Sequence, residues 1–317
     1  MKKKEILQKT WVVCALALIS NAFWGSAFPS VKIGYQLFAI PGDSPASQIF
    51  FAGLRFTLAG ILAVLIGSLL AGKMLIPKKS SWGSIAKLSV FQTMIDYIFF
   101  YQGLAHITGV KGAIIGASST FISILMASFL FRTEKMTGKK ILACAIGFAG
   151  VLLVNINGGG FSSGIHFNGE GFMLISVCSG AVAANLLNIY SKDEDPVVLS
   201  GYQFILGGVV MAICGYALGG RVYAVSPAGL MILFHLAVIS SVAFSLWGIL
   251  LEYNPVSKVT IFGFCTPVFG VLFSAMFLKE ENQTEPWKIL VSLILVSIGI
   301  LLLNYQKGAY EKTKKTT

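Results

Sequence analysis

The sequence predicts an all-α integral membrane protein: ten transmembrane helices arranged as two inverted five-helix repeats, with both termini in the cytoplasm. Three observations predict this architecture. The chain is dominated by long apolar stretches, several motifs occur twice in the same order, and lysine and arginine are concentrated in alternate connecting segments.

Ten apolar stretches are long enough to form transmembrane helices. Hydrophobic residues make up 56% of the 317 residues and charged residues 12%, which is far from the composition of a soluble domain. A bilayer core of about 30 Å needs about 20 apolar residues in a helix. The stretches lie at residues 11–29, 47–71, 82–104, 110–130, 139–155, 169–190, 198–217, 227–251, 256–278 and 286–305.

The net charge of +11 follows the predicted topology. With the N-terminus inside, the outer segments carry only Lys32, Lys111, Arg221 and Lys279, and most other lysine and arginine residues fall in cytoplasmic segments. This is the positive-inside pattern of a multi-pass protein. It predicts a cell membrane, inner or plasma, and explains the basic charge without nucleic acid as a partner. We expect the first apolar stretch to be a retained helix, because no convincing small-residue cleavage site follows it.

Three blocks of sequence recur after about half the chain. Residues 53–60 (GLRFTLAG) and 201–208 (GYQFILGG) share the pattern G-x-x-F-x-L-x-G, a spaced series at 110–134 recurs at 256–280, and 150–155 recurs at 299–304. Two units of five helices have opposite orientations in the membrane, because five is odd. We therefore divide the chain into a first repeat (11–155), a glycine-rich external linker (156–168), a second repeat (169–305) and a basic cytoplasmic tail (306–317).

Small residues gather on the fourth predicted helix. Gly112 and Gly116 form a G-x-x-x-G step, which lets helix backbones approach closely. We expect this step to pack against another helix of the same chain. The alternative is a seam between two copies, so a homodimer stays open.

Several short motifs resemble those of one transporter family. The motifs are Phe23–Phe28 (FWGSAF) followed by Lys32, Arg55-Phe56, the apolar helix ends closing on Glu134 and Glu280, and Thr266-Pro267-Val268. In this order they resemble the EamA-type carriers of the drug/metabolite transporter superfamily. The resemblance implies a ten-helix inverted-repeat fold and the export or exchange of small metabolites such as amino acids. The sequence departs from the pattern at Phe121, where the second repeat has Pro267, and at Glu252.

Two charged residues fall well inside predicted spans. A charge at the middle of a bilayer costs about 2.5–3.5 kcal/mol even on the lenient scale, so such residues usually have a function or a partner. Arg55 and Asp96 lie at similar depth on consecutive helices, and we expect them to pair. The pair is either a structural ion pair or a site for a substrate carboxylate or a proton.

Further candidate residues surround this pair. Gln92 and Asp96 with Phe100 share one helical face, and Tyr97 adds a second ring, which would suit an amphipathic solute. Such a stripe is also common in ordinary packing. The other substrate-site candidates are Asn21, Trp24, Ser241, Ser245 and Trp247. Asp96 and His235 are the candidates for proton coupling, although a lone histidine is more often a hydrogen-bonded core residue.

The sequence contains no pattern of an enzyme or a cofactor protein. We find no metal-ligand spacing, phosphate loop or nucleophile motif, and the five cysteines all fall within predicted spans. We therefore expect no catalytic residue, metal or cofactor. The prediction is a carrier of a small-molecule solute within the lipid bilayer, by default an exporter. The alternatives are an uptake permease of the same fold, a receptor or assembly protein and, least favoured, an intramembrane enzyme.

Overall fold

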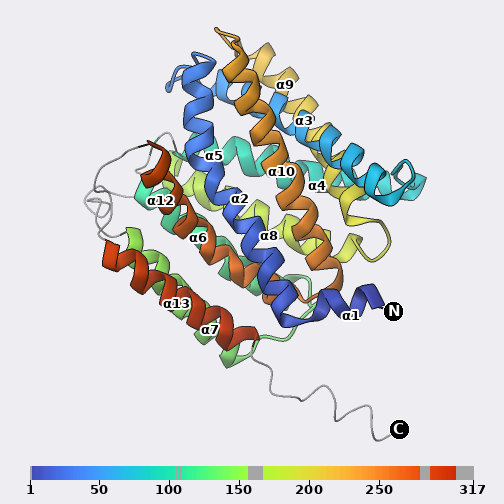
Figure 1. The fold of residues 1–317 in the computed structure, drawn as a ribbon, viewed down its shortest axis with the longest axis vertical. Helices are drawn as coiled ribbons and strands as arrows, with labels where there is room; N and C mark the ends of the chain where they lie inside the picture. The colour runs from blue at the N-terminus through green and yellow to red at the C-terminus, as the bar shows by residue number, and fades with distance from the viewer. Residues whose placement is uncertain (1, 105, 107–108, 156–166, 279–285, 305–317) are drawn as a thin grey trace, which may run out of the picture.

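A computed structural model describes residues 2–104, 106, 109–155, 167–278 and 286–304, and every regular element in this part of the chain is helical (Figure 1). The predicted linker (156–168) and tail (306–317) lie almost entirely outside these residues. In the first half the elements are α1 Lys2–Gln8, α2 Thr10–Leu37, α3 Pro45–Ala71, η1 Lys79–Ser81, α4 Trp82–Leu88, η2 Ser89–Ile95, α5 Asp96–Leu104, α6 Gly109–Leu125, η3 Met126–Leu130 and α7 Gly138–Asn155. In the second half they are η4 Phe167–Gly171, α8 Phe172–Tyr190, α9 Pro196–Ala217, α10 Pro227–Tyr253, α11 Val256–Thr260, η5 Ile261–Phe264, α12 Cys265–Leu278 and α13 Pro286–Asn304.

The helices are those of a multi-pass membrane protein. Within the described residues, five are long and apolar enough to cross a bilayer: α2, α3, the unit Phe167–Tyr190, α9 and α10. Shorter apolar helices occur at Ile115–Leu130, Val256–Gly270 and Leu290–Leu303. Many large apolar side chains face outward, among them Leu70, Ile213 and Met231. An apolar outer surface of this extent fits contact with lipid. The full set of ten spans stays a prediction.

The first predicted helix is longer than the sequence suggested. We predicted residues 11–29, but α2 continues through Pro29 to Leu37. Proline removes one backbone hydrogen bond and disturbs a helix, and the rest of the bundle can hold the helix together beyond it. Lys32 therefore lies within α2 and not in an outer loop, which corrects our prediction.

Two of the predicted helices are interrupted. The helix at 82–104 consists of α4, the π-helical segment η2 and α5. The helix at 256–278 consists of α11, the 3₁₀ segment η5 and α12, and η5 ends three residues before Pro267. The missing N–H of Pro267 prevents a regular hydrogen bond to residue 263. The corresponding stretch of the first half, with Phe121 in place of the proline, is regular helix in α6 to Leu125.

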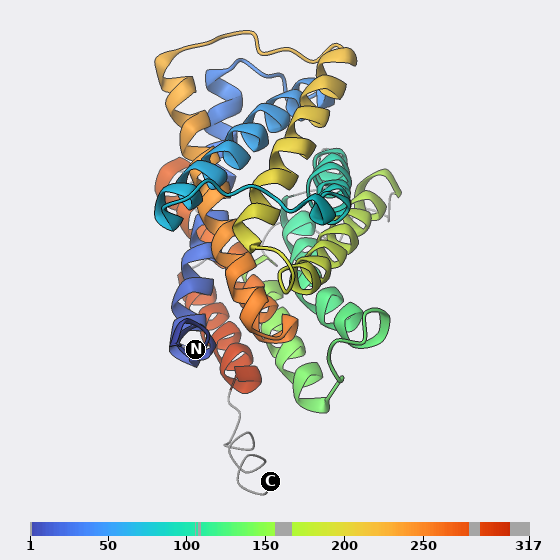
Figure 2. The same cartoon turned by 90° about the vertical axis from the view of Figure 1, so that its right-hand side faces the viewer.

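Each half packs on the other through corresponding helices. α3 lies against α9, and α7 lies against α13, as Figures 1 and 2 show. α2 packs on α10 and α12, and its counterpart α8 packs on α5 and α6. The contacts of α2 with the second half therefore have counterparts in the contacts of α8 with the first half.

The duplicated glycines form the contact between α3 and α9. A Cβ atom on Gly60 would lie 2.4 Å from the carbonyl oxygen of Gly201, and one on Gly208 would lie 2.4 Å from the nitrogen of Thr57 and 2.9 Å from the carbonyl oxygen of Gly53. The first glycine of one copy therefore meets the last glycine of the other. Two corresponding helices can meet in this order only if they run antiparallel. The motif recurs because both helices need a flat surface at this crossing.

The G-x-x-x-G step of α6 does not show the packing that we expected. At Gly116, no atom of the described residues outside the neighbouring backbone of α6 lies within 4 Å of the position that a Cβ would occupy. The surroundings of Gly112 lie outside the described side chains. The prediction of close packing within the chain is therefore wrong at Gly116. The alternative, a seam between two copies of the chain, stays untested.

Candidate functional site

A continuous series of aromatic rings crosses the region where the two halves meet. The ring of Trp24 in α2 lies 4.9 Å from that of Phe244 in α10, and Phe244 lies 4.8 Å from Phe204 in α9. Phe204 stacks on Phe56 of α3 at 5.2 Å, and Phe56 lies 4.3 Å from Tyr97 of α5. Phe56 and Phe204 are the phenylalanines of the duplicated motif. The motif therefore supplies both the glycine crossing and the ring pair beside it.

Arg55 lies beside this series and is buried, with 4% of its surface exposed. Its Nη2 donates to the hydroxyl of Ser240 in α10 at 3.0 Å, and its guanidinium carbon lies 4.8 Å from the centre of the Phe56 ring. Its Nε has no hydrogen-bond partner among the described residues. No carboxylate of the described residues pairs with it. In the described part of the chain, this buried positive charge therefore has one neutral hydroxyl and one ring as its partners.

Asp96 does not pair with Arg55, which corrects our prediction. The carboxylate accepts from the hydroxyl of Ser176 in α8 at 2.6 Å, and its second oxygen lies over Gly180 of the same helix. The π-helical segment η2 ends directly before Asp96. A π-helical turn rotates the residues that follow it about the helix axis, compared with a regular α-helix. The similar predicted depth of Arg55 and Asp96 therefore did not bring their side chains together.

The residue that corresponds to Arg55 in the second half is Gln203. It is fully buried, and its Oε1 accepts from the hydroxyl of Thr93 in η2 at 2.6 Å. Thr93 and Ser240 lie in the third helix of their respective halves, one repeat spacing apart to within a residue. In each half, the residue that precedes the phenylalanine of the duplicated motif, Arg55 or Gln203, is therefore hydrogen-bonded to a hydroxyl of the other half. Only one of the two copies carries a charge.

The other predicted substrate-site residues divide into two groups. Trp247 joins the aromatic series through Trp24 at 4.9 Å, and Phe100 joins it through Tyr97 at 6.4 Å. Gln92 is buried, and no described residue donates a hydrogen bond to its Oε1.

Asn21, Ser241 and Ser245 belong to the second group. Asn21 is fully buried, bonds to the carbonyl of Ala17 and accepts from Thr266 of α12 at 2.5 Å, so its amide ties two helices together. Ser241 donates to a carbonyl of its own helix. Ser245 is half-buried in α10.

His235 lies on the outer side of α10. Its side chain is exposed beside exposed Met231 and Phe234, whereas Leu236 and Ser240 are buried. The structure therefore does not bring His235 together with Arg55 and the aromatic series.

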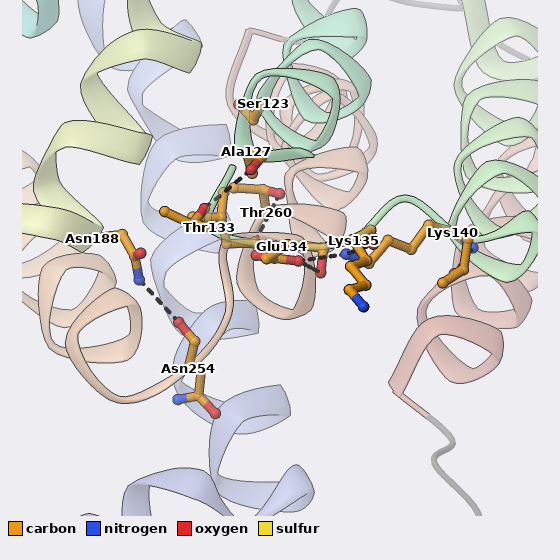
Figure 3. Close-up of polar contacts among 12 residues, drawn as sticks. Ser123, Ala127, Thr133, Glu134, Lys135, Lys140, Asn188, Asn254 and Thr260 are labelled. Carbon is orange, nitrogen blue, oxygen red and sulfur yellow. Dashed lines mark hydrogen bonds and ion pairs between the residues drawn. The ribbon is translucent and has the colours of Figure 1, made fainter. Parts of the chain in front are cut away.

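A network of polar contacts closes the end of the bundle at which α1 lies (Figure 3). Glu134, after η3, accepts from the backbone N–H of Ser257 at 3.0 Å and from its hydroxyl, and Lys140 of α7 donates to Glu134 at 2.6 Å. Nearby, Nδ2 of Asn188 in α8 donates to the carbonyl of Asn254 after α10 at 3.2 Å. Glu134 thus contacts α7 through Lys140, and it also caps α11 of the other half.

Glu194 makes a second contact between connecting segments. Its carboxylate accepts from the backbone N–H of Lys78 at 2.9 Å, the hydroxyl of Ser81 at 2.8 Å and the N–H of Asp195 at 3.1 Å. Burial acts to raise the pKa of Glu194, but these hydrogen bonds and the charge of Lys78 hold it below its ordinary value of 4.5. This carboxylate thus stabilises the loops before α4 and after α8 while it is ionised.

The structure adds residues that the sequence analysis missed. Ser240, Gln203, Thr93 and Phe204 all contribute to the contact between the halves. One signal was available, because aligning the two motif copies places Gln203 opposite Arg55. The partners Ser240 and Thr93 had no such signal. Among the described residues, no group of three or more metal-ligating side chains occurs.

The chain is similar to known transporters over most of its length. A sequence profile of the EamA-like transporter family matches residues 11–156 and again residues 167–305. A WAT1-related chloroplastic protein of Arabidopsis thaliana is 25% identical, over 90% of this chain and 68% of the relative. An uncharacterized transporter of Archaeoglobus fulgidus is 24% identical, over 93% and 90%. A probable amino-acid metabolite efflux pump of Escherichia coli is 24% identical, over 84% and 87%. One crystal structure has the same fold, with a TM-score of 0.72 at 14% identity over 92% of this chain and 97% of that chain.

Proposed function

The chain belongs to the EamA-like transporter family, and from this premise we propose that it exports small organic metabolites, such as amino acids or similar amphipathic solutes, by alternating access. Members of this family are membrane transporters and not enzymes. The direction and the class of solute are our inference. They draw on the relative that is described as a probable amino-acid metabolite efflux pump.

The antiparallel crossing of α3 and α9 is the observation that carries this proposal. Corresponding helices of two halves meet head to tail through the same glycines, with an aromatic series and a buried arginine beside the crossing. In carriers built from inverted repeats, the solute site lies where the repeats meet, and rocking of one repeat against the other exposes it to each side in turn. We place the substrate site between the halves, at Trp24, Arg55, Tyr97, Phe100 and Trp247.

The contacts at the α1 end fit a carrier with one side closed. Glu134 of the first half is joined there to Ser257 of the second half through hydrogen bonds that can break and re-form. We predict that this end faces the cytoplasm, and that its contacts separate when the solute site opens inward. In this proposal both repeats lie in the cell membrane, at residues 11–155 and 169–305.

Counterflow in proteoliposomes tests the proposal. Vesicles containing the full chain are loaded with one unlabelled solute at a time, from a panel of amino acids and related metabolites, and given the labelled form outside. We expect saturable exchange for at least one solute, and none in protein-free vesicles. Efflux from preloaded cells then decides direction, because an exporter lowers the intracellular level and an uptake permease raises it. Absence of exchange across the panel would count against a metabolite carrier and favour a receptor or assembly protein.

A further inference from the structure

We propose that Arg55 is the anion-binding residue of this carrier, and that its solute has a carboxylate group next to an apolar body. The inference deepens the proposed function and rests on it for transport. It makes a separate claim about binding, which is tested separately below.

The burial of Arg55 requires a partner that the described residues do not supply. A guanidinium group has five N–H donors, and the structure gives this one a single hydrogen bond, to a neutral hydroxyl. Burial of a charge is costly unless the charge is paired, and a cation over a phenylalanine ring offsets only part of that cost. The unpartnered Nε shows that hydrogen-bonding capacity is left over. A planar carboxylate can take two parallel N–H bonds from one arginine, so it fits this remaining capacity.

The second half shows that the fold itself does not need this charge. Gln203 occupies the corresponding position and makes the corresponding contact, to Thr93 instead of Ser240. The neutral amide of Gln203 in α9 is therefore sufficient for a hydrogen bond to the third helix of the other half. Because the structural role is met without a charge in one copy, the charge in the other copy is available for a ligand.

The side chains around Arg55 favour a single negative charge with an apolar neighbour. Ser240, Phe244 and Trp247 are spaced for one face of α10, and seven residues of helix span about 10 Å. Arg55 is hydrogen-bonded to Ser240 at one end of this face. Trp247 lies at the other end, where its ring contacts that of Trp24. Ser240 and Phe56, the partners of Arg55 among the described residues, are neutral, so they leave its positive charge unbalanced. A monocarboxylate with an aromatic or branched apolar group would place its charge at Arg55 and its body along Phe244.

Binding is tested on the purified full chain by the shift in its unfolding temperature with ligand concentration. The probes are two matched pairs that differ in the carboxylate: 3-phenylpropanoate with 3-phenylpropanamide, and phenylalanine with phenylalaninamide. We expect the carboxylates to raise the unfolding temperature and the amides to leave it unchanged. Equal stabilisation by both members of each pair would overturn the proposal, and so would no stabilisation by either carboxylate.

Three variants locate the effect. Arg55→Gln copies the residue of the other half, so we expect it to fold and to bind the carboxylates about ten-fold or more weakly, as for the loss of a charged hydrogen bond. Arg55→Lys should bind with intermediate affinity, because it keeps the charge and loses the planar fork. Arg221→Gln is the matched control, because it makes the same change at an exposed arginine between α9 and α10, and we expect it to keep the preference for carboxylates. Carboxylate binding by Arg55→Gln that equals the wild type would overturn the proposal. If Arg55→Gln did not fold, the matched pairs on the wild-type chain would still decide whether the carboxylate is recognised.

Binding and transport can fail independently in these experiments. Carboxylate-dependent stabilisation without counterflow would support the anion site and contradict the carrier. Counterflow of solutes and amides alike, with Arg55→Gln as active as the wild type, would support the carrier and contradict the anion site.

Discussion

At the residue scale, the carboxyl group of Asp96 lies against α8 and does not pair with Arg55. Its described partners there are the hydroxyl of Ser176 and the backbone surface at Gly180. A half-buried carboxylate that has no cationic partner among the described residues is suited to bind and release a proton. Our hypothesis of proton coupling at Asp96 therefore does not depend on the predicted pair with Arg55.

We predict that Asp96→Asn separates exchange from proton-driven transport. Asparagine keeps an acceptor for Ser176 but cannot titrate, so counterflow should stay within about two-fold of the wild type, whereas accumulation driven by a pH gradient should be lost. Both are measured in proteoliposomes with the same labelled solute. Ser176→Ala serves as the control, since it removes the hydrogen bond and keeps the carboxylate. An equal response of Asp96→Asn and the wild type to the gradient would contradict coupling at this residue.

Glu194 leads to a prediction about stability and pH. Its pKa is held below 4.5 in the folded chain, so the folded state binds its proton less readily than the unfolded state does. Its stabilising effect is therefore present above pH 4.5 and disappears as the pH falls through the lower, folded pKa. We expect Glu194→Gln to lower the stability by about 1 kcal/mol at pH 7, the usual value of a lost hydrogen bond. Thermal unfolding at pH 7 and at a series of pH values below 4.5 checks this, and a difference from wild type that does not shrink as the pH falls would contradict it.

The sequence identified Arg55 but not its surroundings, for a physical reason. A charged residue inside an apolar stretch is visible from composition, because the bilayer makes it costly. Which hydroxyl it meets depends on how each helix is rotated, and the π-helical segment before Asp96 changes that rotation without any marker in the local sequence. Asn21 shows a different limit of the sequence. Its polarity suggested a pocket, and the structure shows its amide bonded to Ala17 and Thr266, so a role in substrate binding stays a prediction.

At the element scale, the contact of α3 with α9 depends on glycine. The backbones approach so closely that a methyl group on Gly60 would lie 2.4 Å from the carbonyl oxygen of Gly201. Because the obstructing atom belongs to the backbone, the helices themselves would have to move apart. The ring pair of Phe56 and Phe204 lies next to this crossing, so separation of the helices would also disturb the proposed site.

We predict that Gly60→Ala destabilises the fold and that Gly83→Ala does not. Gly83 is also helical, but open space surrounds the position of its Cβ, so alanine there should be neutral or stabilise by up to about 1 kcal/mol. Unfolding temperature and the yield of monodisperse protein measure both variants. If Gly60→Ala matched Gly83→Ala in both measurements, the crossing would be looser than the structure shows.

Helix positions were more predictable than helix ends and irregularities. Long apolar stretches placed α3, α9 and α10 close to their observed positions, since a span of the bilayer needs a minimum number of apolar residues. The end of α2 was misplaced because Pro29 looks like a terminus, whereas the helix passes through it. The 3₁₀ segment η5 had a visible cause in Pro267, but the π segments η2 and η3 have no comparable signal.

At the scale of the whole molecule, the duplicated sequence and the antiparallel crossing support the same arrangement by independent routes. A unit of five helices must change orientation when it is repeated, and corresponding helices of inverted units must run antiparallel where they pack. The charge bias then sets which side is cytoplasmic. The polar contacts of Glu134 and Asn254 lie at the predicted cytoplasmic side.

The orientation is tested by labelling single cysteines with a membrane-impermeant maleimide. Lys192 and Tyr223 are both exposed and lie just beyond opposite ends of α9, so in a chain without its native cysteines they report on the two sides of one helix. In intact cells we expect Tyr223→Cys to be labelled and Lys192→Cys to be protected until the cells are permeabilised. The reverse pattern would invert the topology and place the contacts of Glu134 outside. Labelling of both positions from one side would show that α9 does not span the membrane, and the inverted-repeat carrier could then not be correct.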